Sequence, residues 1–127
     1  MSEKHDIPIL LPVGTYARLY NESVAAHKSM EQYCITQLLS NLTNTDVLRG
    51  LSAHFKRPYS QGETLWLGSP DSPSYLPRLG NLKVSKRLHL RLTEEQRSTM
   101  APLVLSLDCP ESHAYVLLLH EGLRVRA

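Results

Sequence analysis

The sequence predicts a mostly α-helical protein with short β-strands, in which one strand–helix–helix unit is written twice. Residues 86–92 alternate charged and apolar side chains, which is typical of a strand with one buried face. Thr93 and Gln96 then form the capping box that begins a helix. Residues 7–42 and 88–123 also share one apolar pattern when they are shifted by 81 residues, so that Ile9 falls on Leu90.

Composition sets the class of protein. The chain has 127 residues, of which 42% are hydrophobic and 20% charged, as in a globular protein. No apolar stretch is long enough to span a bilayer, and the polar N-terminus is unlike a signal peptide, so we expect a cytoplasmic protein. In that setting Cys34 and Cys109 are expected to be reduced thiols. The net charge is only +2, but residues 83–91 hold four basic side chains and no acidic one, which favours a polyanionic partner.

The first unit is expected to occupy residues 1–42. A short extended segment at 6–11 leads to Pro12, which suits the first turn of a helix over about 13–26. His27 and Lys28 break this helix. Ser29 then caps a second helix, with Gln32 at the capping-box position, that runs to about Leu42.

Residues 43–80 are expected to form a connector. Asn44 or Thr45 could cap a short helix over 46–54. Seven prolines and glycines between Pro58 and Gly80 then exclude regular helix. Residues 64–67 could form a short strand, or Trp66 could pin the loop to the domain. A loop of this length would allow the two units to fold back and pair.

The second unit is expected to occupy residues 81–127. Its strand is followed by a helix over 94–107, which Pro102 should kink or shorten. The sequence Asp108-Cys109-Pro110 marks a break. A last helix is expected over 111–125, with Arg124 suited to its C-terminal end.

These residues resemble the ribbon-helix-helix family of DNA-binding proteins (Arc/MetJ/CopG type). Residues 86–95 are similar to the family's strand and helix start, and residues 25–31 resemble its turn. The resemblance covers about 80 of the residues. It implies a tandem ribbon-helix-helix fold, with a two-stranded antiparallel ribbon on a four-helix core and a proline-rich connector, as in single-chain proteins of the TraY type.

The resemblance also implies sequence-specific binding of double-stranded DNA, with the ribbon in the major groove. The protein would then be a transcriptional repressor or regulator, or a plasmid or phage accessory factor. The side chains that would read bases are Arg87, His89 and Arg91. Contacts to the DNA backbone would come from Lys83 and Lys86 and from the starts of the second helices, at Ser112, Ser29 and Met30.

The first strand departs from this pattern, because its outward positions, Asp6, Pro8 and Leu10, offer no cation. Two arrangements stay open. The first strand could pair with the second within one chain, making an intrachain pseudo-dimer. Alternatively, second strands from two chains could pair in a homodimer. Glu111, beside Ser112, is also a poor neighbour for a phosphate.

A second functional class is a protein-binding, antitoxin-like or inhibitor module whose connector engages a partner protein. Trp66 and Tyr75 are its candidate contacts, although both could instead stack on bases or anchor the loop. No arrangement typical of nucleophilic, phosphate-binding or paired-carboxylate catalysis stands out, so we expect no enzyme activity and no cofactor. His113 and His120 lack companions at metal-binding spacing, so no metal is expected.

Overall fold

The two copies of the predicted unit begin at matching positions in the structure. The computed structural model describes residues 3–80 and 84–126. The first copy comprises β1 (Lys4–Pro12), α1 (Val13–Ala25) and α2 (Met30–Asn41), and the second comprises β4 (Ser85–Thr93), α4 (Glu94–Leu107) and α5 (Glu111–Arg126). Each element of the first copy begins 81 residues before its counterpart. The starts of these six elements thus follow the 81-residue interval of the apolar pattern.

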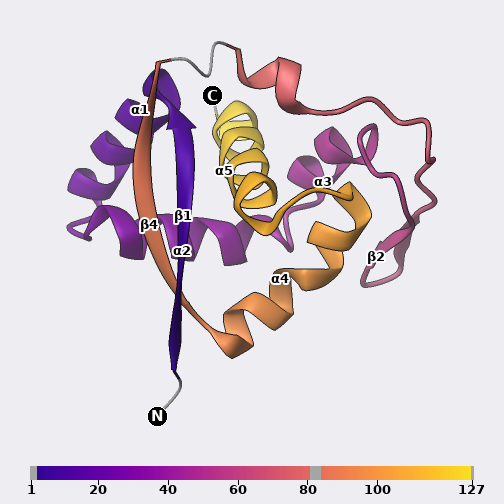
Figure 1. Cartoon of the computed structure of the whole chain (residues 1–127), viewed down its shortest axis with the longest axis horizontal. Helices are drawn as coiled ribbons and strands as arrows, with labels where there is room; N and C mark the ends of the chain where they lie inside the picture. The colour runs from indigo at the N-terminus through magenta and orange to yellow at the C-terminus, as the bar shows by residue number, and fades with distance from the viewer. Residues whose placement is uncertain (1–2, 81–83, 127) are drawn as a thin grey trace.

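The long strands β1 and β4 pair antiparallel within the one chain and form a two-stranded ribbon (Figure 1). Pro8 lies opposite His89 at the centre of the register. Pro8 and His89 are also 81 residues apart, which is the repeat interval. The two strands are therefore related by an approximate twofold axis that passes between these two residues. Ile9 and Leu90 point to the inner face and are buried, as strand alternation requires.

Local capping explains where the repeated helices begin and end. The Ser29 hydroxyl accepts a hydrogen bond from the backbone N–H of Gln32 at 3.1 Å, and Thr93 and Gln96 form the predicted capping box. The helix ends also match. His27 has φ 57° after α1, and Asp108 has φ 51° after α4, so each chain turn passes through the left-handed region.

The helix α5 lies at the centre of the structure. It contacts β1, α1, α2, α3 (Thr45–Ser52) and α4, and Figure 1 shows it between the ribbon and α3. A single hydrophobic cluster joins residues from both copies and from the connector, including Leu38, Leu103 and Leu48. The connector is thus part of the core.

The expected fold, a tandem ribbon-helix-helix arrangement with one two-stranded ribbon on a four-helix core and a proline-rich connector, is wrong. The described residues form five α-helices and two two-stranded sheets, because β2 (Tyr59–Gln61) and β3 (Thr64–Trp66) make a second antiparallel hairpin. The fifth helix, α3, buries Val47, Leu48 and Leu51 against the other helices. That apolar side is too large to leave in water, so the connector must dock on α5.

Two smaller features also bear on the sequence predictions. Pro102 does not shorten α4, which continues from Glu94 to Leu107 because Met100 and Leu103 on either side are buried in the core. A short 3-10 helix, η1 (Leu76–Leu79), lies before the second copy. Among the described residues there is no helix with the length and apolar character to cross a membrane.

Candidate nucleic-acid interface

The outer face of the ribbon carries the predicted base-reading side chains. Arg87, His89 and Arg91 are all exposed on β4, alternating with the inward-facing leucines. Because β1 is the partner strand, this face also includes Lys4, Asp6, Pro8 and Leu10. The structure therefore brings the three predicted residues together, beside the β1 positions that the sequence marked as poor in cations.

Two of these side chains are paired with carboxylates. Arg91 donates from Nε and Nη2 to the Glu31 carboxylate at 3.0 and 2.8 Å, and its backbone N–H donates to Glu31 at 2.9 Å. These bonds from Arg91 hold the pKa of Glu31 below its usual value. His89 Nδ1 lies 3.0 Å from an Asp6 carboxylate oxygen. The local field of the ribbon is consequently weaker than its basic residues alone would produce.

The end of the ribbon near α5 is largely apolar. Arg87 lies opposite Leu10 and lines a groove of about 300 Å³ with residues that include Leu76 of η1 and Ser112 of α5. The neighbouring Glu111 carboxylate accepts hydrogen bonds from Arg97 and Tyr115. Ser112 therefore has an apolar segment on one side and a carboxylate on the other, and neither favours a phosphate.

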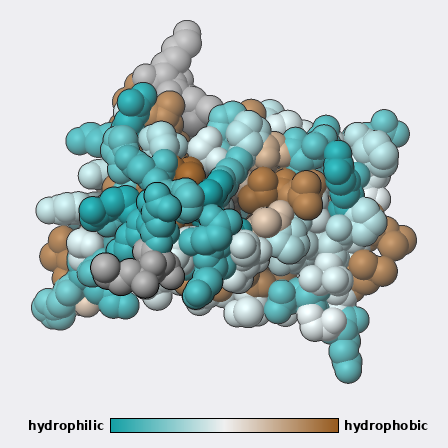
Figure 2. All heavy atoms as spheres, turned by 60° about the horizontal axis from the view of Figure 1, so that its bottom comes forward, coloured by the Kyte–Doolittle hydropathy of each residue, from teal (hydrophilic) through white to brown (hydrophobic). Residues whose placement is uncertain are grey.

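The opposite end of the ribbon, near α2, is cationic. Lys4, Lys28 and Arg91 line a pocket of about 480 Å³ beside the first turn of α2, together with Gln32, Ile35, Thr36, Thr93 and Gln96. No described carboxylate lines this pocket. Figure 2, in which the bottom of Figure 1 comes forward, shows hydrophilic side chains gathered around the end of the ribbon where β1 begins.

Ser29 and Met30 lie beside this cationic pocket, at the start of α2. The Ser29 hydroxyl is used as the helix cap, and Met30 packs partly against the core, so this turn would offer a ligand its backbone N–H groups. Sequence reasoning missed Lys4 and Lys28. Their positions could have indicated them, because Lys4 is at the start of β1 and Lys28 is two residues before the start of α2.

The other predicted backbone contacts are placed differently. The ammonium group of Lys86 lies 5.4 Å from the centre of the Tyr16 ring, on the α1 side of the ribbon, so it does not share the face of Arg87. Lys83 lies outside the described residues. Among the described residues, it is therefore the α2 end of the ribbon that combines a predicted base-reading residue, Arg91, with nearby cations.

The two aromatic residues proposed for partner binding are engaged inside the fold. Trp66 is half-buried, stacks on Tyr59 with ring centres 6.1 Å apart, and meets Phe55 edge-on. Tyr75 is only 1% exposed, and its hydroxyl donates to Glu121 at 2.7 Å. Tyr75 as a partner-binding residue is a wrong prediction, because its burial leaves no surface to present.

The part of the chain that the structure describes contains neither a metal-binding cluster nor a cysteine with a lowered pKa. No group of three or more His, Cys, Asp or Glu side chains there is arranged to hold a metal ion. Cys34 and Cys109 are free thiols. Burial raises the pKa of Cys34 to about 12 and that of Cys109 to about 11, so both stay protonated at neutral pH.

The chain was also compared with known proteins. No family model, no curated protein and no solved structure matches it.

Proposed function

We propose that this protein binds double-stranded DNA sequence-specifically, with the outer face of the β1–β4 ribbon in the major groove. It would act as a repressor or regulator, or as a plasmid or phage accessory factor. The observation that carries the proposal is the exposed row of Arg87, His89 and Arg91 on β4, with a cationic pocket at one end. A two-stranded ribbon fits the major groove, and arginine is the commonest reader of guanine there.

The pairing of Arg91 with Glu31 is compatible with base reading. The carboxylate uses Nε and Nη2 of the guanidinium, so the Nη1 group still has its two donors for a base edge. Glu31 would then hold the arginine in one orientation before DNA arrives. Its charge opposes the phosphates, so the pairing trades affinity for a fixed geometry.

The two ends of the ribbon would meet the DNA backbone unequally. At the α2 end, Lys4 and Lys28 stand beside the helix start, so this end suits phosphate groups. At the α5 end, Leu76 and Leu79 of η1 line the groove that contains Ser112. We therefore assign the main backbone contact to the α2 end and not to Ser112.

The test is a selection from a randomised duplex library, followed by fluorescence anisotropy on the selected sequence at several salt concentrations. The triple variant Arg87→Ala, His89→Ala, Arg91→Ala should lose sequence preference, since each good arginine–guanine pair supplies about 1–3 kcal/mol of discrimination. The double variant Lys4→Ala, Lys28→Ala should bind every duplex more weakly, and its salt slope should fall by about 2.

The matched control is Arg49→Ala, which removes an exposed arginine on α3 that pairs only with Asp46 among the described residues. It should leave both affinity and salt slope unchanged. If the wild-type protein selects no sequence, or binds duplexes as the triple variant does, the proposal is overturned.

A second candidate function, an antitoxin-like or inhibitor module, is favoured by one observation. Leu65 and Leu67, on and just after β3, are 59% and 72% exposed, so the connector presents apolar side chains outward. This reading predicts a partner protein that copurifies with the wild type and with the triple strand variant, but not with the Leu65→Ser, Leu67→Ser variant. Loss of the partner from the strand variant would contradict it.

A further inference from the structure

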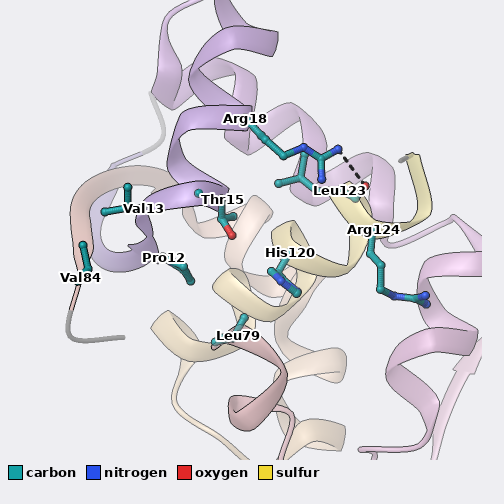
Figure 3. Close-up of a pocket in the computed structure, with 10 residues that line it drawn as sticks. Pro12, Val13, Thr15, Arg18, Leu79, Val84, His120, Leu123 and Arg124 are labelled. Carbon is teal, nitrogen blue, oxygen red and sulfur yellow. Dashed lines mark hydrogen bonds between the residues drawn. The ribbon is translucent and has the colours of Figure 1, made fainter. Parts of the chain in front are cut away.

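A second pocket lies away from the outer face of the ribbon, where the ribbon closes onto α1 and α5 (Figure 3). Its volume is about 610 Å³, within the range of small-molecule sites. Pro12 at the end of β1, Leu79 of η1, Val84 before β4 and Leu123 of α5 supply apolar wall. Strand end, connector and helix therefore meet around one space.

The polar groups of this pocket are cationic or neutral. Thr15, Arg18, His120 and Arg124 line it, and no described carboxylate does. In Figure 3 the Thr15 hydroxyl and the His120 ring lie near its centre, and Arg18 reaches across from α1 toward Leu123. Arg124 extends away from them, and its guanidinium binds Glu121. Arg18 is thus the cation best placed for a ligand.

The hydrogen-bonding groups of Arg18 and His120 are only partly used. Arg18 donates from Nη2 to the Leu123 carbonyl at 3.3 Å, and no described carboxylate pairs with it. Because the Tyr75 hydroxyl donates to Glu121, it accepts from His120 Nδ1–H at 2.8 Å. No described residue binds His120 Nε2, which becomes a donor when the ring is protonated. A ligand between α1 and α5 could therefore accept hydrogen bonds from Arg18 and from the protonated ring of His120.

We propose that this pocket binds a small organic carboxylate. Arg18, His120 and the Thr15 hydroxyl would hold the anionic head, and the apolar wall at Pro12, Leu79 and Leu123 would cover a short hydrocarbon body. The site is separate from the DNA-binding face and does not rest on the proposed function.

The electrostatic surroundings of His120 agree with an anionic ligand. The charged and titratable neighbours are Arg18 on α1, Tyr75 and Arg78 in the connector, and Glu121 and Arg124 on α5, with His54, in the turn after α3, against Tyr75. Burial first, and then the three arginines, lower the pKa of His120 despite Glu121. A bound carboxylate would offset the repulsion and raise that pKa.

The test uses three probes: hexanoate, 1-hexanol and inorganic phosphate. NMR would follow both the binding isotherms and the titration of the His120 ring in the full chain. Hexanoate should bind saturably, at least about tenfold more tightly than either other probe, and should raise the pH midpoint of His120. If hexanol binds as tightly as hexanoate, the proposed recognition of the carboxylate is wrong. If phosphate binds as tightly as hexanoate, the proposed contact of the apolar wall with a hydrocarbon body is wrong.

Two variants locate the site. Arg18→Gln should weaken hexanoate binding by about tenfold or more, because it replaces a charged donor by a shorter, neutral amide. Thr15→Val, which is close to threonine in shape, should weaken binding by a smaller factor. It keeps the hydrogen bond from Arg18 to Leu123, so it still tests the site if Arg18→Gln does not fold. Arg49→Gln, on the exposed side of α3, should have no effect. Hexanoate binding that is absent, or unchanged in both pocket variants, refutes the proposal.

Discussion

Glu31 on α2 binds both the side chain and the backbone N–H of Arg91 on β4, so one carboxylate fixes a residue of the ribbon and also shields it. These two effects act in opposite directions on DNA binding. Orientation of the guanidinium favours base reading, whereas the negative charge beside the groove repels phosphates. They can be separated by substitution.

Glu31→Gln keeps an oxygen acceptor for Arg91 and removes the charge. We expect it to raise affinity for all duplexes severalfold at low salt while sequence preference is retained. Glu31→Ala removes the acceptor as well and should lose preference at the base that Arg91 reads. Fluorescence anisotropy on matched and mismatched duplexes measures both. Glu63→Gln, at the exposed tip of the β2–β3 hairpin, is the charge-matched control. Weaker binding by Glu31→Gln would contradict the shielding role.

Stability at acid pH should depend on four carboxyl groups whose pKa values are lowered below 4.5, namely Glu22, Glu31, Glu111 and Glu121. For Glu31 and Glu111 the largest cause is the hydrogen bonding from Arg91 and Arg97, which lowers the pKa. For Glu22 and Glu121 burial is the largest single effect and raises the pKa. Hydrogen bonds from tyrosine and arginine, together with the arginine charges, outweigh it. The unfolded chain binds more protons, so these groups stabilise the fold above about pH 4.5 and lose that effect as pH falls through their lowered values.

His120 should add an earlier component, because its pKa is lowered from 6.5. Between 6.5 and its folded value the unfolded chain again binds more protons, so this contribution to stability declines as pH falls below about 6.5. Urea unfolding from pH 7.5 to 3 should show a decline that steepens below pH 4.5. In His120→Gln the first part of the decline should be reduced. A free energy of unfolding that rises toward pH 3 would contradict both assignments.

Tyr75 should contribute strongly to the stability of the fold. Its hydroxyl donates to the fully buried Glu121 carboxylate and contacts His120, which ties the connector to α5. Tyr75→Phe should lower the free energy of unfolding by about 2 kcal/mol, since hydrogen bonds to charged groups are worth about 1.5–3 kcal/mol. Tyr20→Phe, on the exposed side of α1, should change it by less than about 0.5 kcal/mol. Equal effects in denaturant titrations would contradict this role.

Gly50 and Gly14 both lie in helices, yet alanine should act on them in opposite directions. A Cβ at Gly50 would overlap the Glu121 carboxylate, which Arg124 and Tyr75 hold in place. Gly50→Ala should therefore cost about 2 kcal/mol through overpacking. A Cβ at Gly14 meets nothing within 4 Å, so Gly14→Ala should gain about 0.5 kcal/mol from helix propensity. Denaturant titrations measure both changes in the free energy of unfolding. If both alanine variants are more stable than the wild type, helix propensity alone decides and the overlap with Glu121 costs nothing.

The repeated elements could be predicted from the sequence because their signals are local. Ser29 and Thr93 cap the helices that follow them, and alternation along residues 86–92 sets the two faces of β4. The repeat interval even agrees with the strand register, since Pro8 and His89 are both one interval apart and paired. Each of these features depends on residues close in sequence or on one regular spacing.

The remaining features depend on contacts between distant residues, which spacing does not encode. Glu121 reads as a polar residue on a helix, and only its bond to Tyr75, 46 residues away, explains its burial. The pairing of Arg91 with Glu31, 60 residues away, changes the charge of the ribbon in the same way. The docking of α3 likewise follows from apolar residues whose partners on α5 could not be named in advance.

The turn before α2 offers a direct test of strain at a repeated position. His27 has φ 57°, a left-handed conformation that costs a non-glycine residue roughly 1–2 kcal/mol. His27→Gly should therefore raise the free energy of unfolding by about 1 kcal/mol. Ala26→Gly, at the adjacent position with φ −86°, is the matched control and should lower it by about 0.5 kcal/mol.

The counterpart one repeat later should respond in the same direction. Asp108 has φ 51°, and Asp108→Gly should gain less than His27→Gly because aspartate tolerates the left-handed region better than most residues. The three variants can be compared by guanidinium unfolding followed by circular dichroism. If His27→Gly destabilises the protein as much as Ala26→Gly does, the left-handed turn stores no relievable strain. The His27 side chain must then stabilise the turn by an amount that offsets its backbone cost.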